Sequence, residues 1–208
     1  MSDDTASADP SLRQGELQVL VVADLVKAPH VAHIVGLPEL IAESVVDHVL
    51  HDPMDFSLFR QLAPAGLDAL LGECIGLARF WASIGYQESC FGAELEKDGS
   101  GDGEHGWGPW QGDIRTHAQL VAAIRACVPF SPEWWAVSCH GCLPIALAAA
   151  QEYPGNVEAC ACRYNCRKDL VDAGLTAGDP NVHTTHSPDG RGYGEMVMGR
   201  IQAWWPSA

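Results

Sequence analysis

The chain has 208 residues, long enough for one domain with a sizeable core, and its hydrophobic share of 47% and charged share of 19% are those of a folded globular protein. Twelve Lys and Arg stand against 27 Asp and Glu, giving a net charge of -15. This charge repels phosphates and anionic lipids, which argues against nucleic acid and membrane surfaces as partners. It also gives no long-range attraction to polyanionic bacterial walls.

The first residues carry no recognisable export or anchoring signal. Residues 1–15 are polar, and we expect them to form a disordered leader. Met1-Ser2-Asp3-Asp4 lacks the basic start of a secretory signal peptide. The apolar run from Leu17 to Val26 is interrupted by Asp24 and is too short to span a bilayer. We therefore expect no transmembrane segment.

Residues 16–65 form an apolar region that the sequence predicts to be mainly helical. Its clearest helix begins near Pro38 and carries one apolar stripe, made of Leu37, Leu40, Ile41, Val45 and Val49. Four histidines in this region are interpreted as solvated or core-edge residues, because no metal-ligand pattern accompanies them: His30, His33, His48 and His51. We assign no chemistry to this region.

A break at Pro64-Ala65-Gly66 precedes a second region, residues 66–208. Its first segment is predicted to be a buried helix running to Glu88, with apolar residues at helical spacing: Leu67, Leu70, Leu71, Cys74, Ala78 and Trp81. The glycine-rich stretch from Gly99 to Gly112 predicts turns with short strands. Glu88 therefore lies at a helix end beside an irregular wall.

The second half is predicted to be helical again. Ser131-Pro132 predicts a helix start, Pro144 a break or kink, and Tyr153-Pro154-Gly155 a helix end. Two further helical segments follow, at about 160–170 and 193–205, separated by a loop. These elements predict an α+β fold that is mainly α, with a small Gly-rich β-hairpin region and an N-terminal helical extension.

Metal sites are weighed against simpler interpretations. Asp98, Ser100 and Asp102 resemble the first half of an EF-hand calcium loop, but Pro109 stands where its last ligand belongs. The eight cysteines could form disulfides, remain buried thiols, or supply a zinc site from five of them, and we favour the first two because Cys packs well in small-residue helices. The five are Cys139, Cys142, Cys160, Cys162 and Cys166. We expect neither a metal nor a cofactor.

Three carboxylates, Glu88, Asp102 and Asp113, are candidates for the acid and base of a glycoside hydrolysis reaction. That reaction needs a protonated acid at the leaving oxygen and, in inverting enzymes, a second carboxylate that activates water. Glu88 leaves an apolar helix, where desolvation is expected to raise its pKa. Asp102 and Asp113 lie in a polar, Gly-rich stretch, where ionisation is easier. The pattern fits one acid and one base.

Several ordered motifs resemble the goose-type lysozyme family. Glu88-Ser89, Gly92, Asp102 and the run GWGPWQGDIRTH at 106–117 are similar to its E-S, its glycine-rich hairpin and its G-F-G-L-M-Q-V-D-x-R-S-H. Downstream, three segments are similar to its F-P, its A-Y-N and its T-T-H followed by a tyrosine: Tyr153-Pro154, Arg163-Tyr164-Asn165, and Thr184-Thr185-His186 with Tyr193. The resemblance covers about residues 66–208. It departs at Pro109-Trp110, where the family has L-M, and at Cys166-Arg167, where it has A-G.

The resemblance implies a lysozyme-like catalytic domain over 66–208 that cuts the β-1,4 bond after N-acetylmuramic acid in peptidoglycan, by an inverting mechanism. Glu88 would be the general acid, and Asp102 and Asp113 would hold the attacking water. Gln111, Tyr164, Asn165 and His186 are the implied substrate-binding residues. Trp107 and Trp110 are added because aromatic faces stack on sugar rings.

This function predicts action on the cell wall, outside the cytoplasm, and allows a proteinaceous inhibitor or immunity protein as a further partner. Three alternatives stay open. A lytic transglycosylase would use the sugar's own hydroxyl in place of water, and an inactive wall-binding or inhibitory domain would retain only the fold. A cysteine peptidase or amidase would use Cys90 or Cys139 with a histidine.

Overall fold

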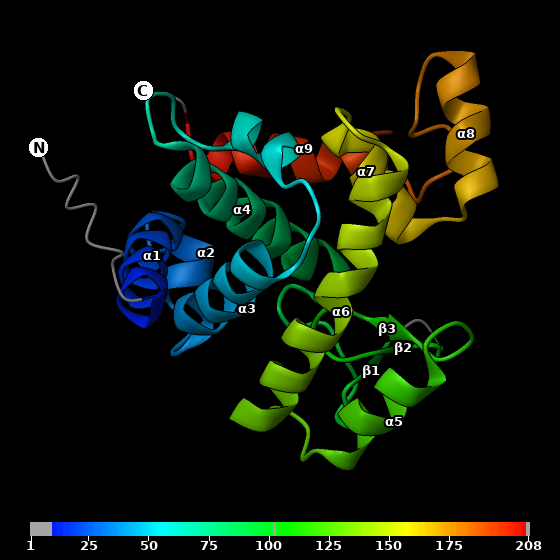
Figure 1. The fold of residues 1–208 in the computed structure, drawn as a ribbon. Helices are drawn as coiled ribbons and strands as arrows, with labels where there is room; N and C mark the ends of the chain where they lie inside the picture. The colour runs from blue at the N-terminus through cyan, green and yellow to red at the C-terminus, as the bar shows by residue number, and fades with distance from the viewer. Residues whose placement is uncertain (1–9, 102, 207–208) are drawn as a thin grey trace, which may run out of the picture.

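The computed structural model describes residues 10–101 and 103–206, and most of them are helical (Figure 1). Residues 1–9 of the predicted disordered leader lie outside the described residues, and the prediction was wrong for residues 10–15, which form the start of the first helix. The N-terminal half contains five helical elements: α1 (Pro10–Leu25), α2 (Pro29–Ala32), α3 (Leu37–His51), the 3-10 helix η1 (Ser57–Leu62) and α4 (Ala69–Ser89). Helices α3 and α4 confirm the predicted helices in this half.

The glycine-rich stretch forms the predicted short strands. They are β1 (Ser100–Gly101), β2 (Gly106–Trp107) and β3 (Gly112–Asp113), in an antiparallel sheet of order β1-β2-β3. The register pairs Trp107 of β2 with Ser100 on one side and Gly112 on the other. The structure is therefore mainly α with one small antiparallel sheet, as predicted.

In the rest of the described residues, up to residue 206, the helices are α5 (Ala118–Ala126), α6 (Pro132–Glu152), α7 (Val157–Asn165), α8 (Lys168–Ala177) and α9 (Tyr193–Trp204). The Ser131 side chain caps α6 by accepting a hydrogen bond from the Trp134 amide, as its sequence predicts. Pro144 does not break α6, which runs through it to Glu152. The segment predicted around 160–170 is two helices, because the chain becomes extended at Cys166 and Arg167 before α8 begins.

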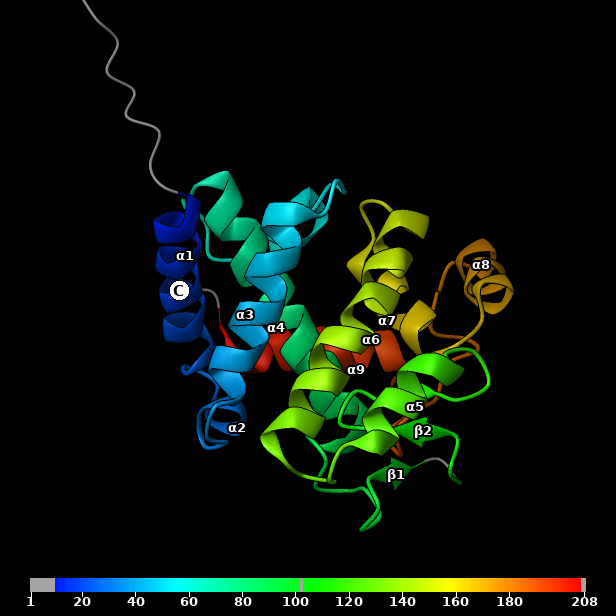
Figure 2. The same ribbon diagram turned by 60° about the horizontal axis from the view of Figure 1, so that its bottom comes forward.

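Helix α4 lies at the centre of the molecule. Its residues from Cys74 to Gly85 are all buried, and one continuous cluster of buried side chains extends from Leu17 to Trp205. A Cβ on Gly76 would lie 1.8 Å from the Phe59 carbonyl oxygen, so η1 packs directly on the α4 backbone. Figures 1 and 2 place α1–α3 on one side of α4 and the sheet with α5 towards the other side. The N-terminal helices therefore share the core of the remaining chain.

A buried ion pair fastens α1 to α4. The Arg79 guanidinium donates to both carboxylate oxygens of Asp24, at 2.7 and 2.8 Å, while the Trp205 indole donates to the Asp24 carbonyl at 3.0 Å. Asp24 and Arg79 are only 3% and 6% exposed.

Among the described residues, no helix combines the length and apolar character that a membrane crossing requires.

Candidate functional site

Glu88 occupies the last turn of α4, and its neighbours fix where that helix ends. Cys90 adopts left-handed backbone angles (φ 48°) and closes the helix. The buried Ser89 hydroxyl donates to the Pro109 carbonyl at 2.7 Å and accepts from the Gly92 amide at 2.7 Å. The Glu-Ser pair thus joins the end of the central helix to the loop between β2 and β3.

Tyr193, the first residue of α9, donates a hydrogen bond from its hydroxyl to a Glu88 carboxylate oxygen. The tyrosine is buried, whereas Glu88 is half-buried. Burial raises the pKa of Tyr193 well above its usual value, and the charge of Glu88 and the hydrogen bond to it add to the rise. Tyr193 therefore remains a protonated donor to Glu88 at any ordinary pH.

Asn181 organises the start of α9 and was not anticipated from the sequence. Its side-chain oxygen accepts from the Gly194 and Glu195 amides at 2.8 and 3.2 Å, and its amide nitrogen donates to Glu158 at 2.6 Å. Asn181 is buried, and an added Cβ on Gly192 would lie 2.3 Å from the Asn181 Cβ. These contacts fix the position of α9, and with it that of Tyr193.

The Thr-Thr-His motif contributes to the same arrangement. The buried Thr184 hydroxyl donates to the Asn181 carbonyl at 2.8 Å and accepts from the Tyr193 amide at 3.0 Å. The exposed His186 pairs with Gly192 in an isolated β-bridge. Residues 184 to 186 therefore anchor the loop that delivers Tyr193 to Glu88.

A cleft of about 630 Å³ opens between β3, the start of α5, α6 and the end of α7. Four predicted site residues line it: Gln111, Asp113, Tyr164 and Asn165. Burial raises the pKa of Tyr164 well above its usual value, and nearby Cys142 and Glu88 add to the rise. The end of α4 and Tyr164 bond to the same loop, because Ser89 donates to the Pro109 carbonyl and Tyr164 donates to the Trp110 carbonyl.

Asp113 enters the cleft as an ion pair with its near neighbour Arg115. The Arg115 side chain contacts both carboxylate oxygens, at 2.6 to 3.1 Å, and its amide donates to the same group at 2.8 Å. The hydrogen bonds from the Arg115 side chain are the main cause that lowers the pKa of Asp113. Asp113 is therefore ionised at neutral pH, as the predicted base or water-holding group must be.

Gln111 and Tyr164 are held by the loop that carries the GWGPWQG run. Gln111 has a positive φ of 50° and donates from its side chain to the Gly108 carbonyl at 2.7 Å. Its oxygen would lie 2.1 Å from a Cβ on Gly106, so the amide rests directly on the sheet. The Tyr164 hydroxyl donates to the Trp110 carbonyl at 2.6 Å, which ties α7 to this loop.

Trp107 and Trp110 are not placed to stack on sugar rings, as was predicted for them. Trp110 is fully buried, stacks on Trp81 at 5.3 Å and donates to the Trp81 carbonyl at 3.1 Å. Trp107 is 7% exposed, and the Arg125 guanidinium lies 4.7 Å above its ring. Both rings are enclosed, so neither is available to stack on a sugar.

Asn165 and Asp102 differ in their placement. Asn165 lines the cleft and accepts from the Thr185 amide at 3.0 Å, which connects α7 to the Thr-Thr-His loop. Asp102 lies outside the described residues. Asp98, which precedes it, accepts from the amide and hydroxyl of Ser100 at 3.0 and 2.6 Å.

The structure favours buried thiols over the other cysteine interpretations. All eight cysteines are free, and within residues 10–101 and 103–206 no group of three His, Cys, Asp or Glu side chains could hold a metal. Burial raises the pKa of Cys139 to about 12 and that of Cys90 to about 11. Such thiols are poor nucleophiles, which argues against a cysteine peptidase.

Sequence reasoning placed Gln111, Asp113, Tyr164 and Asn165 at one cleft but missed the cationic wall beside them. Arg163, Arg167 and Arg115 also line the cleft, and Arg163 and Arg167 stand where the goose-type pattern has small residues. That departure from the goose-type pattern was the sequence signal that could have revealed the arginines.

Comparisons of the chain with protein-family models, with curated proteins and with solved structures gave no match. The geometry of the site is therefore the basis for a functional proposal.

Proposed function

We propose that this protein is a peptidoglycan-cleaving glycosidase with a lysozyme-like catalytic region, and that Glu88 is its general acid. The observation that carries the proposal is the position of Glu88. It lies at the end of the central helix and receives a hydrogen bond from the buried Tyr193. The next residue, Ser89, and Tyr164 of the cleft lining bond to the adjacent carbonyls of Pro109 and Trp110, which connects this helix end to a cleft that contains the ionised Asp113. Glycoside hydrolysis requires an acid and a separate carboxylate.

In this proposal the carboxylic acid form of Glu88 protonates the leaving oxygen of the β-1,4 bond. Tyr193 orients the carboxyl group by donating a hydrogen bond to one of its oxygens. Asp113 holds and activates the water that attacks the opposite face of the sugar. Gln111 and Asn165 supply amide groups in the cleft that suit the acetamido and hydroxyl groups of the glycan.

Lytic transglycosylation is a second candidate, and one specific observation favours it. Arg115 occupies both oxygens of Asp113 and lowers its pKa, which makes this carboxylate a weak base for water. The sugar's own 6-hydroxyl would then take the place of water. The substrate, the scissile bond and the role of Glu88 are the same in both reactions.

Digestion of purified peptidoglycan tests the proposal. We expect the protein to clear a suspension of insoluble peptidoglycan and to release muropeptides that mass spectrometry identifies as fragments cut after N-acetylmuramic acid. Fragments cut only within the peptides, or no release at all with folded protein, would reject a glycosidase. The second result would leave the inactive wall-binding domain, which a pull-down with the same insoluble material detects.

A further inference from the structure

The cleft concentrates positive charge in a strongly acidic chain. Among the residues that the structure describes, its lining contains Arg115, Arg163 and Arg167 and one acidic residue, Asp113, whereas the whole chain has 12 Lys and Arg against 27 Asp and Glu. The cleft also takes in His117 and Arg167, the residues that precede the first turns of α5 and α8. Helix N-termini carry partial positive charge, so these two helices add to the field of the arginines.

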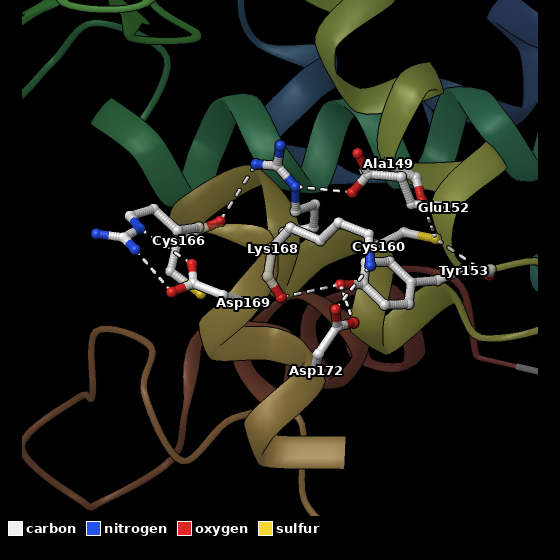
Figure 3. A network of polar contacts seen from close by, with 10 residues as sticks. Ala149, Glu152, Tyr153, Cys160, Cys166, Lys168, Asp169 and Asp172 are labelled. Carbon is white, nitrogen blue, oxygen red and sulfur yellow. Dashed lines mark hydrogen bonds and ion pairs between the residues drawn. The ribbon is translucent and has the colours of Figure 1, made fainter. Parts of the chain in front are cut away.

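Acidic side chains behind the wall hold two of these arginines in place. Arg163 contacts Glu152 at 2.8 Å and also donates to the Cys166 carbonyl at 3.3 Å, while Arg167 contacts Asp169 at 3.0 and 2.6 Å. Figure 3 shows Glu152, Cys166 and Asp169 around this network. Neither Glu152 nor Asp169 is among the cleft-lining residues, so the arginines line the cleft and their partners stand behind it.

The two ion pairs leave the arginines able to bind a further anion. The Arg167 side chain is 79% exposed and that of Asp169 is 59% exposed, and exposed pairs of this kind contribute little to stability. A guanidinium has five N–H donors in one plane, so it can keep one carboxylate and still offer an edge to a second one.

We propose that Arg163 and Arg167 form a subsite that binds a carboxylate of the substrate. The inference rests on the proposed function and extends it, because a peptidoglycan strand carries carboxylates beside its glycan. They belong either to the peptide stem or, where the stem has been removed, to the lactyl group of the muramic acid. A neutral glycan such as chitin has neither, so this subsite would select peptidoglycan over chitin.

Direct binding tests the subsite independently of cleavage. Three probes are titrated into the Glu88→Gln protein by calorimetry: N-acetylmuramic acid, N-acetylmuramoyl-L-alanyl-D-glutamate and N-acetylglucosamine. We expect at least one of the two carboxylate probes to bind, and its affinity to fall about tenfold in the Arg163→Gln/Arg167→Gln variant, since each charge-assisted hydrogen bond contributes a few-fold or more. Loss for N-acetylmuramic acid identifies the lactyl carboxylate, and loss for the peptide probe alone identifies the stem.

The matched control is the Arg13→Gln/Arg60→Gln variant, which removes the same charge from α1 and η1, neither of which contributes to the cleft lining. We expect its affinity to match that of the parent protein, and thermal unfolding verifies that both double variants fold. Arg167→Lys keeps the charge but loses the planar fork, so we expect an intermediate loss. The inference is overturned if neither carboxylate probe binds, or if the cleft variant and the control lose affinity equally. Binding without cleavage would reject the glycosidase but retain the subsite.

Discussion

The hydroxyl of Tyr193 donates a hydrogen bond to the carboxylate of Glu88, joining residues that lie 105 positions apart in the chain. The bond connects the first residue of α9 to the last turn of α4, the two helices that pack side by side in Figure 1. Because α4 is the centre of the core and Asn181 fixes α9, both partners of this hydrogen bond are held by buried structure.

Replacing Glu88 by Gln should abolish cleavage while leaving the fold intact. The amide retains the shape of the carboxyl group but cannot donate the proton that the leaving oxygen needs, so we expect the rate to fall by roughly 10² to 10⁴. Release of soluble muropeptides measures the rate, and thermal unfolding measures stability. Glu39→Gln on the exposed face of α3 is the control and should keep full activity. A Glu88→Gln protein with more than about a tenth of the parent activity would contradict the assignment.

Tyr193→Phe should lower the turnover rate more than it weakens substrate binding. The variant keeps the buried ring but removes the hydroxyl donor, so the acid loses the contact that orients it. We expect kcat to fall about tenfold or more with KM changed by less than about threefold, the sign of an interaction that matters in the transition state. Tyr153→Phe, which removes a hydroxyl bonded to Asp172 on α8, is the matched control. Equal effects of the two variants on kcat would mean that Tyr193 has only a structural role.

The buried pair of Asp24 and Arg79 should make stability depend on pH in the acid range. Burial alone would raise the pKa of Asp24, but the hydrogen bonds and charges of Arg79 and Lys27 outweigh it and lower the pKa below 3.8. The ionised pair therefore contributes its full stabilisation above about pH 4, and this contribution is lost as the pH falls through the lower pKa of the folded state.

Asp24→Asn should then reduce the free energy of unfolding by about 3 to 5 kcal/mol at pH 7, because it leaves a buried guanidinium without its charge partner. The difference from the parent should shrink as the pH is lowered from 7 towards 2, because Asp24 of the parent becomes increasingly protonated. Urea unfolding at the two pH values measures it. Asp47→Asn removes an exposed partner of His51 and should cost less than about 1 kcal/mol. A pH-independent loss in Asp24→Asn would show that the charge does not matter.

Thiol alkylation should leave activity intact once the cleft cysteine is removed. Burial raises the pKa of Cys139 and Cys142 to about 12, so at pH 8 these thiols are protonated and enclosed. Cys166 is less buried and lines the cleft, so a group attached to it would obstruct substrate. We expect iodoacetamide to reduce the activity of the parent protein but not that of Cys166→Ser. Inactivation of both would revive the thiol-nucleophile alternative.

Sequence reasoning located the elements whose signals are local. The stripe from Leu37 to Val49, the Ser131 cap and the glycine-rich strands each depend on spacing or on single-residue conformational preference, and all three are present. Clustering of Gln111, Asp113, Tyr164 and Asn165 followed from the family resemblance and not from local signals.

Tertiary contacts account for what the sequence did not reveal. The burial of Trp110 depends on Gly85, where an added Cβ would lie 2.7 Å from the indole, and nothing near residue 110 encodes that close approach. Asn181 resembles any loop asparagine until α9 and Glu158 are placed around it. The cationic wall likewise needs α7, α8 and the β3 segment to meet at one cleft before its arginines can be recognised as a group.

The products of cleavage should identify the nucleophile. The hydrogen bonds of Arg115 lower the pKa of Asp113 below its usual value, so this carboxylate is ionised at neutral pH and can act as a base. The Arg115 side chain is 59% exposed, and exposed ion pairs contribute little free energy. Substrate or water can therefore displace one contact between Arg115 and Asp113 at a small cost in free energy. We therefore expect reducing ends, and we expect Asp113→Asn to lower the rate of their release by roughly 10²-fold.

Arg115→Gln is a second variant for the same test. It removes the hydrogen bonds of the Arg115 side chain to Asp113 and should raise the basicity of Asp113, which shifts the acid limb of the pH profile to higher pH. Mass spectrometry could instead find 1,6-anhydro-muramic ends that persist in Asp113→Asn. That result would mean that water is not the nucleophile and that the protein is a lytic transglycosylase.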